Sequence, residues 1–171
     1  MRWVDVHARL LDRSLNPQLL TPSQQEAASV IARALVEGVQ YINLYGGPGV
    51  GKTFLARHLA HELGCCYMSG FGTETLTPIA ERWVLVDNAP ENRGDARAVY
   101  GDLLHRSAVA VLVITHNLVR DSLFTVPLNL TKDDQDVVRS TVAETFPSFR
   151  LSGNHQRLTS LWTLVRLSCD E

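Results

Sequence analysis

The sequence predicts a three-layer α/β fold, in which helices cover both faces of a mostly parallel sheet of about five strands. Two observations indicate this fold. Short apolar runs alternate with helical patterns along the chain, and a glycine-rich loop joins one such run to a helix. Alternating strands and helices are typical of parallel sheets, because each parallel connection has to cross a face of the sheet. The apolar content of 45% is sufficient for the core of one domain of 171 residues.

The N-terminal part is predicted to be helical. Residues 3–15 carry an apolar face and are followed by an Asn-Pro break. A second helix is expected to begin after Thr21, with Gln24 completing a capping box, and to end at Gly38. The predicted buried stripe of this helix consists of Val30, Ile31, Ala34 and Leu35.

Strand and helix candidates alternate over the middle of the chain. The predicted strands are YINLY (41–45), CCYM (65–68), WVLVD (83–87) and AVAVLVIT (108–115), and the predicted helices are FLARHLAHEL (54–63) and most of 91–107. After SLFTVPL the alternation stops. Thr131 and Asp134 then cap a helix that is expected to end near Thr145, and residues 155–167 form a last amphipathic helix. The sequence therefore predicts a core at residues 1–128 and a small helical lid at residues 129–171.

The composition argues against several classes of protein. A net charge of −2 without a Lys/Arg-rich cluster does not favour a nucleic-acid partner. Three cysteines, two of them adjacent, fit reduced thiols rather than disulfides, and His58 and His61 lack further residues that would complete a metal site. No apolar run reaches the roughly 20 residues of a membrane span, and the first residues do not form a signal peptide. We therefore expect a cytoplasmic protein without membrane contact.

The stretch GGPGVGKT, residues 46–53, has the spacing of a phosphate-binding loop. Glycines allow backbone N–H groups to surround a polyphosphate at the start of the following helix. Lys52 is expected to reach the β- and γ-phosphates of ATP, and the Thr53 hydroxyl to bind Mg²⁺. The predicted nucleotide-binding residues are Gly46, Gly47, Pro48, Gly49, Val50, Gly51, Lys52, Thr53 and Phe54.

Polar residues follow the third predicted strand. Asp87 ends this apolar strand and is expected to hold Mg²⁺ through water, beside the loop; the alternative is a helix N-cap. Asn88 stands where many ATPases have the glutamate that activates water, and an amide cannot accept a proton. Because loss of a general base costs about 10²–10⁴ in rate, we expect slow hydrolysis unless Glu91 supplies the base. The alternative for Glu91 is a solvated loop acid.

The strand that ends at Thr115 is followed by further polar residues. Thr115 or Asn117 is predicted to bind the γ-phosphate or the attacking water, whereas His116 is interpreted as a turn residue. Arg120 is a candidate arginine finger, directed toward a neighbouring subunit. Four other arginines are rivals for this role: Arg93, Arg97, Arg106 and Arg139.

Together these motifs resemble the AAA+/STAND group of P-loop ATPases, and most closely its NB-ARC-like nucleotide-binding domains. The resemblance covers roughly residues 40–165 and is carried by GGPGVGKT, VLVDNA, VLVIT and VPLNLTKDDQDVV. It implies a P-loop NTPase that binds Mg·ATP and acts as a nucleotide-dependent switch or assembly subunit, with a protein partner or as a homo-oligomer. SGNHQRL resembles the turn near the adenine in the lid of that group, with His155 in place of the usual proline. Two features depart from the NB-ARC pattern. The strand that ends at Thr115 lacks the arginine usual in NB-ARC proteins, and the distance along the chain from Lys52 to Asp87 is short for that family.

Other functions remain open at this point. The segment LTPSQQEAA resembles the adenine-reading segment of superfamily 1 helicases, so Gln24 or Gln25 could read the base; otherwise both glutamines are expected to be exposed. A DNA-transaction ATPase, of helicase or loader type, is therefore one alternative. A small-molecule kinase is another, although no acidic pair follows the second strand. A GTPase would require glycine at Pro90, and the formal guanine motif at residues 131–134 is explained by the helix cap.

Overall fold

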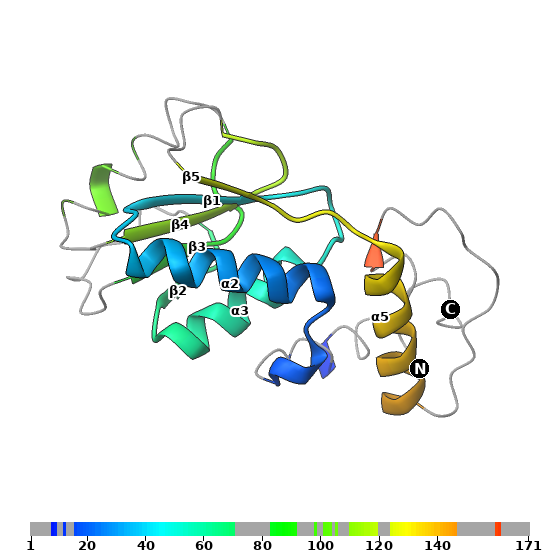
Figure 1. Cartoon of the computed structure of the whole chain (residues 1–171). Coiled ribbons are helices and arrows are strands. Elements are labelled where there is room, and N and C mark those ends of the chain that lie inside the picture. Colours follow the sequence, from blue (N-terminus) through cyan, green and yellow to red (C-terminus); the bar gives the residue numbers. More distant parts are fainter. Residues whose placement is uncertain are drawn as a thin grey trace.

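The computed structural model describes residues 8–9, 12, 16–70, 83–91, 98, 101–103, 105, 110–119, 124–146 and 160–161. Within these residues the chain forms one parallel sheet with helices packed against it (Figure 1). The predicted α/β class and the number of strands are therefore confirmed.

The described elements follow the predicted order, with two additions. In chain order they are η1 (Pro17–Leu19), α2 (Pro22–Val36), β1 (Tyr41–Tyr45), α3 (Lys52–Leu63), β2 (Cys66–Met68), β3 (Trp83–Val86), β4 (Ala110–Thr115), β5 (Phe124–Pro127) and α5 (Lys132–Thr145). The added elements are the short 3₁₀ helix η1, where the sequence predicted only a break, and β5, to which the sequence pattern assigned no strand. Residues 98, 101–103 and 105 are helical, in agreement with the helix predicted over 91–107.

Helix α2 begins and ends as its sequence predicts. The Thr21 hydroxyl accepts a hydrogen bond from the Gln24 backbone N–H, and the Gln24 side chain accepts one from the Thr21 backbone N–H. Both bonds satisfy N–H groups that the first turn of a helix leaves without a backbone partner. Gly38 follows the helix with a φ of +84°, a conformation that glycine adopts at little cost.

The sheet has the strand order β2-β3-β4-β1-β5, and all its pairs are parallel. In this register Tyr45 of β1 lies opposite Thr115 of β4, and Val86 of β3 lies opposite Val113. The carboxyl ends of β1, β3 and β4 therefore meet at one edge of the sheet. Open α/β sheets bind their ligands at this edge.

The three central strands, β1, β3 and β4, are buried on both faces, which explains their nearly continuous apolar sequences. Side chains alternate between the faces along each strand. On one face, Ile42 and Leu44 of β1 pack with residues of α2 and α3, such as Ile31 and Leu55. Figure 1 shows α2 and α3 side by side over this face. The other face has a second apolar cluster of Val84, Val86, Ala89, Leu103, Val111, Val113 and Val119.

Helix α5 lies beyond the carboxyl end of β5, beside the sheet rather than over a face (Figure 1). Its capping box of Thr131 and Asp134 and its end at Thr145 are confirmed. The division into a core and a lid at residue 128 stays a prediction. Of the helices predicted at 3–15 and 155–167, only residues 8, 9, 12, 160 and 161 are described. Across the described ranges, no helix has the length and apolar character of a membrane span.

Candidate nucleotide-binding site

The glycine-rich loop of residues 46–51 leads from the end of β1 directly to the first residue of α3. Gly49 and Gly51 have φ values of +76° and +92°, a region of backbone conformation that favours glycine. Gly51 is the N-cap of α3, and no side chain caps the helix there. The first N–H groups of α3 therefore face the loop without a side-chain acceptor, and such groups bind phosphate readily.

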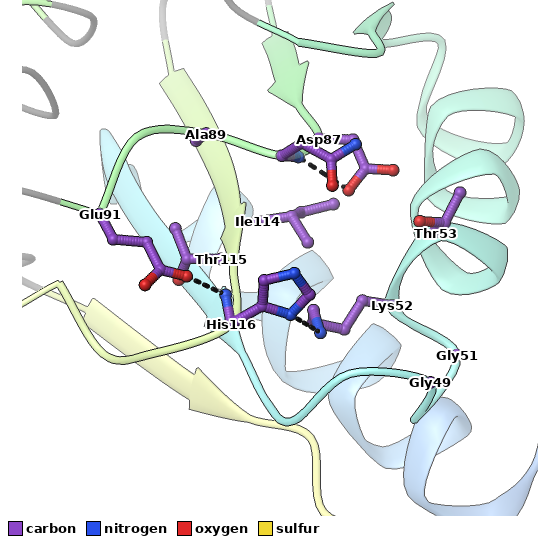
Figure 2. Close-up of a pocket in the computed structure, with 11 residues that line it drawn as sticks. Gly49, Gly51, Lys52, Thr53, Asp87, Ala89, Glu91, Ile114, Thr115 and His116 are labelled. Carbon is purple, nitrogen blue, oxygen red and sulfur yellow. Dashed lines mark hydrogen bonds between the residues drawn. The ribbon is translucent and has the colours of Figure 1, made fainter. Parts of the chain in front are cut away.

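Lys52 is buried at the start of α3, and its ammonium group lies over the loop. Nζ donates hydrogen bonds to the carbonyl oxygens of Gly46 at 2.6 Å and Gly47 at 2.8 Å. It also contacts Nδ1 of His116 (Figure 2), and the two nitrogen atoms are 3.3 Å apart. Burial lowers the pKa of Lys52, against the opposing effect of the negative charges of Asp87 and Glu91. The ammonium is thus fixed against the loop, in the pocket that Thr53 and Asp87 also line.

Asp87 follows β3 directly and is only 2% exposed. Its Oδ2 accepts a hydrogen bond from the Tyr67 hydroxyl at 3.0 Å, and its Oδ1 accepts one from the Asn88 backbone N–H at 3.0 Å. Burial, together with the negative charge of Asp87, raises the pKa of Tyr67, which keeps this phenol a hydrogen-bond donor. Thr53, in the first turn of α3, lines the same pocket as Asp87.

The residues near Asp87 fit a magnesium ion. A carboxylate and a hydroxyl are oxygen donors, which Mg²⁺ prefers. Among the described residues, no group of three His, Cys, Asp or Glu side chains could hold a metal by itself. A magnesium site usually needs only one or two protein ligands, because phosphate oxygens and water complete it.

Asn88 has a structural role that its sequence position did not indicate. Its backbone has a φ of +51°, and asparagine is among the residues that adopt this region most readily. Its side-chain amide donates a hydrogen bond to the Ser69 carbonyl oxygen at 3.3 Å. Asparagine at this position is thus explained by backbone conformation and by the link to the end of β2. The predicted weakness in catalysis stays a prediction.

Glu91 is bound to the end of β4. Its Oε1 accepts a hydrogen bond from the backbone N–H group of His116 at 2.6 Å (Figure 2). Oε1 also accepts one from the Asn117 backbone N–H at 3.1 Å, and Oε2 accepts one from the Asn117 side chain at 2.7 Å. The hydrogen bond from the Asn117 side chain lowers the pKa of Glu91, with further lowering by the two backbone N–H groups. Glu91 also lines the pocket. The carboxylate is therefore ionised at neutral pH and fixed to the residues that follow β4.

Thr115 is buried at the end of β4 and lines the pocket. Its hydroxyl donates to the Asn117 carbonyl oxygen at 2.6 Å and accepts from the Asn43 side chain at 2.9 Å. The Asn43 side-chain oxygen accepts in turn from the Val119 backbone N–H at 3.0 Å. To donate to a phosphate, the Thr115 hydroxyl would have to leave the Asn117 carbonyl. Asn43 was not predicted to contribute. A signal was present, since Asn43 is a polar residue between Ile42 and Leu44 in the predicted strand YINLY.

The structure gathers most of the predicted site residues in one pocket. Its volume of about 310 Å³ lies at the lower end of the range of about 300–1,000 Å³ for small-molecule sites. The lining residues are Gly49, Gly51, Lys52, Thr53, Asp87, Asn88, Ala89, Glu91, Ile114, Thr115 and His116. His116 follows β4 in a bend, as predicted, and it also lines the pocket.

Other predicted residues lie elsewhere. Asn117 contacts Glu91 and does not line the pocket. Phe54 packs against the apolar cluster that the sheet forms with α2 and α3. Arg139 lies on α5, 3.8 Å from the Asp136 carboxylate in the same helix. The candidates Arg93, Arg97, Arg106 and Arg120 lie outside the described residues.

Gln24 requires a correction. It was expected to read the base or to be exposed, and the expectation of exposure is wrong, since only 3% of it is exposed. Its side-chain nitrogen donates to the Gly51 carbonyl oxygen at 3.1 Å, and its side-chain oxygen accepts from the Thr21 backbone N–H at 2.9 Å. Gln25 is exposed, as expected. The Gln24 amide thus stabilises the end of the phosphate loop through the Gly51 carbonyl group.

The C-terminal segment also contacts the loop. The Leu161 backbone N–H donates to the Gly49 carbonyl oxygen at 2.8 Å, and the Leu161 side chain is buried. A side chain at Gly49 would collide with Ser160. Residues 160–161 therefore lie against the middle of the phosphate loop.

Part of the chain matches a known protein family. Residues 42–116 match the family described as "ATPase family associated with various cellular activities (AAA)". This segment runs from β1 to the residue after β4 and contains the phosphate loop, Asp87 and Thr115. This match agrees with the predicted AAA+ resemblance. The comparisons do not extend to the NB-ARC-like subtype.

Two relatives are 30% identical over 119 residues, 65% of this chain: the Holliday junction branch migration complex subunit RuvB from two strains of Nitratidesulfovibrio vulgaris, DP4 and Hildenborough. The chain spans 36% of the length of these relatives. A solved structure of a RuvB mutant from Thermotoga maritima is similar with a TM-score of 0.50 and 16% identity, over 71% of this chain and 50% of that one. This likeness shows that the fold is that of an α/β P-loop NTPase.

Proposed function

Because residues 42–116 match the AAA family of ATPases, we propose that the chain binds Mg·ATP and acts as a nucleotide-dependent switch or assembly subunit. The observation that carries this proposal is the common pocket of Lys52, Thr53 and Asp87 at the carboxyl edge of the sheet. An ammonium, a hydroxyl and a carboxylate in that arrangement match the needs of a triphosphate with its magnesium ion.

Each of these groups has a distinct role in the proposal. The loop N–H groups and Lys52 bind the β- and γ-phosphates, while Thr53 and Asp87 hold Mg²⁺ directly or through water. Mg²⁺, when bound, neutralises charge that develops on the transferred phosphoryl group. Thr115, held by Asn43, is the candidate contact to the γ-phosphate or the attacking water.

Hydrolysis is proposed to be slow in the isolated chain. Asn88 cannot take a proton, and the Glu91 carboxylate has three of its acceptor positions filled by His116 and Asn117. A candidate arginine finger, Arg120 or one of its rivals, would come from a neighbouring subunit. The NB-ARC-like subtype, and a protein partner or homo-oligomer, belong to the same proposal. The name of the RuvB relatives, a complex subunit, supports assembly.

Substitution of Lys52 tests the site. Charged hydrogen bonds contribute about 1.5–3 kcal/mol, so Lys52→Ala is expected to weaken ATP binding by at least about tenfold. Isothermal titration of wild type and variant with ATP measures this change. Lys132→Ala removes the same charge from the exposed start of α5 and is the matched control.

Two results would contradict the assignment. Lys52→Ala that is folded and binds ATP like the wild type would show that the phosphates do not bind at this loop. A strong preference of the wild type for GTP over ATP would contradict the AAA+ reading and favour the guanine alternative.

A DNA-transaction ATPase is the second candidate function. The observation that favours it is the 30% identity to relatives named for Holliday junction branch migration, although the chain spans only 36% of their length and its net charge is −2. Stimulation of ATP hydrolysis by single-stranded or junction DNA would support this candidate. A rate that DNA does not change would leave the switch proposal as the better one.

A further inference from the structure

The Asp134 carboxylate makes more contacts than the cap of its own helix requires. Its Oδ2 accepts from the Thr131 backbone N–H and hydroxyl, both at 2.7 Å, which completes the capping box of α5. It also accepts from the Ser23 hydroxyl at 2.7 Å, and Oδ1 accepts from the Ser23 backbone N–H at 2.9 Å. Only 1% of Asp134 is exposed. One buried carboxylate therefore joins the first turn of α5 to the first turn of α2.

These contacts keep Asp134 ionised. Burial alone would raise the pKa of this carboxyl group, but the hydrogen bonds from Ser23 and Thr131 outweigh it, so that the pKa lies below its usual value. Hydrogen bonds to an ionised acceptor are about twice as strong as those between neutral groups. The connection between the two helices is thus a charged one, shielded from water.

The next residue of α2 contacts the phosphate loop. Gln24 is buried, and its side-chain nitrogen donates to the carbonyl oxygen of Gly51, the N-cap of α3. Its side-chain oxygen is held by the Thr21 backbone N–H, so the amide has a fixed orientation. Ser23 and Gln24 are consecutive residues in one helical turn. One of them contacts α5, and the other contacts the residue before Lys52.

We propose that Asp134 and Gln24 are positioning residues that couple α5 to the phosphate loop through the first turn of α2. A shift of α5 would move the Asp134 carboxylate, and with it the turn that holds the Gly51 carbonyl. Nucleotide that orders the loop would, by the same connection, order α5, because coupling between two sites is reciprocal. This inference rests on the proposed ATP binding and assigns the route by which occupancy reaches the C-terminal part.

Titration of ATP to single and double variants tests this coupling. Asp134→Asn keeps the size of the side chain but brings an NH₂ group against the donors of Ser23 and Thr131. Gln24→Leu removes both side-chain hydrogen bonds. Each single variant is expected to weaken ATP binding about fivefold or more, the lower range of typical coupling. In the Gln24→Leu background, Asp134→Asn should have no further effect. Asp133→Asn, the neighbouring exposed carboxylate, is the control and should bind ATP like the wild type.

Hydrogen exchange of residues 132–145 provides a readout that a merely structural role would not change. In the wild type, saturating ATP should slow exchange in α5. In Gln24→Leu, ATP at saturating concentration should leave α5 exchange unchanged. If Asp134→Asn does not fold, Ser23→Ala serves in its place, because it removes one of the two Ser23 contacts and should weaken ATP binding in the same direction.

The outcomes separate this inference from the proposed function. A wild-type chain that does not bind ATP overturns both. A wild-type chain that binds ATP, while folded Asp134→Asn binds it equally well, overturns the coupling alone. The coupling is also overturned if the fold-losses in ATP affinity of the two single variants multiply in the double variant, because the residues would then act independently.

Discussion

Glu91 is the candidate base for hydrolysis in the pocket, since Asn88 cannot accept a proton. Its contacts with His116 and Asn117 give it a fixed place in the pocket, and they also lower its pKa. A lower pKa makes a carboxylate a weaker base. Glu91 can therefore position the end of β4, accept a proton from water, or do both.

Glu91→Gln distinguishes these roles. If Glu91 accepts the proton, the single-turnover rate of ATP hydrolysis should fall by about 10²-fold or more, with ATP affinity unchanged. If it only positions β4, affinity and rate should fall together by a smaller factor. Glu62→Gln, at an exposed acid of α3, controls for loss of charge. If both the rate of hydrolysis and the affinity for ATP stay at the wild-type level, Glu91 contributes neither to hydrolysis nor to ATP binding.

At the scale of elements, the junction of the phosphate loop and α3 depends on backbone conformation. Gly51 has a φ of +92°, and a Cβ added there would collide with the Gln24 side-chain amide. Gly47, in the same loop, has an ordinary φ and no atom within 4 Å of an added Cβ. The two glycines thus offer a matched pair, in which one position is restricted and the other is open.

Gly51→Ala is expected to lower the free energy of unfolding by about 1–3 kcal/mol, the usual cost of a strained backbone conformation. Gly47→Ala should change it by much less, within about 0.5 kcal/mol. Urea denaturation of both variants measures the difference. Equal losses would mean that the conformation of residue 51 is not what stabilises the loop.

The elements could be predicted from the sequence where local signals determine them. The strands β1, β3 and β4 are apolar on both faces, and the caps of α2 and α5 are set by residues three apart, such as Thr131 and Asp134. β5 gave a weaker signal: only Val126 is buried among its four residues, and Pro127 ends it at the edge of the sheet. Edge strands with a proline are hard to distinguish from loops by sequence.

The phosphate loop and Asp87 were predictable because their chemistry requires particular residues next to a strand. The contacts around them were not. Gln24 lies 27 residues before Gly51, and Glu91 lies 25 residues before His116. Asn43 bonds to Thr115 across two strands that are adjacent only in the sheet. Each of these contacts depends on tertiary structure, for which spacing along the chain gives no signal.

At the scale of the whole molecule, ligand binding and stability are linked. ATP that binds only the folded chain should raise the free energy of unfolding by about 2.7 kcal/mol at a concentration 100 times its Kd. Because Mg²⁺ joins Asp87 and Thr53 to the phosphates in our proposal, EDTA should reduce this gain in the wild type. In Asp87→Asn the gain should be smaller and insensitive to EDTA.

Urea denaturation with ATP, with and without EDTA, measures these gains. EDTA without ATP should leave the stability of the wild type unchanged, which is the control for effects unrelated to the nucleotide. A wild-type gain that EDTA does not alter would contradict the assignment of Asp87 and Thr53 to magnesium.

The order of the strands also bears on how the chain folds as it is synthesised. β1, which carries the phosphate loop, has β4 and β5 as its neighbours, and these strands span residues 110–127. While a ribosome is still adding the residues before 110, β1 has neither of these partners. Sheets built from such distant pairings fold slowly, and their unpaired strands are prone to aggregate in the meantime. We therefore expect the nascent chain to become competent for nucleotide only after β5 has emerged.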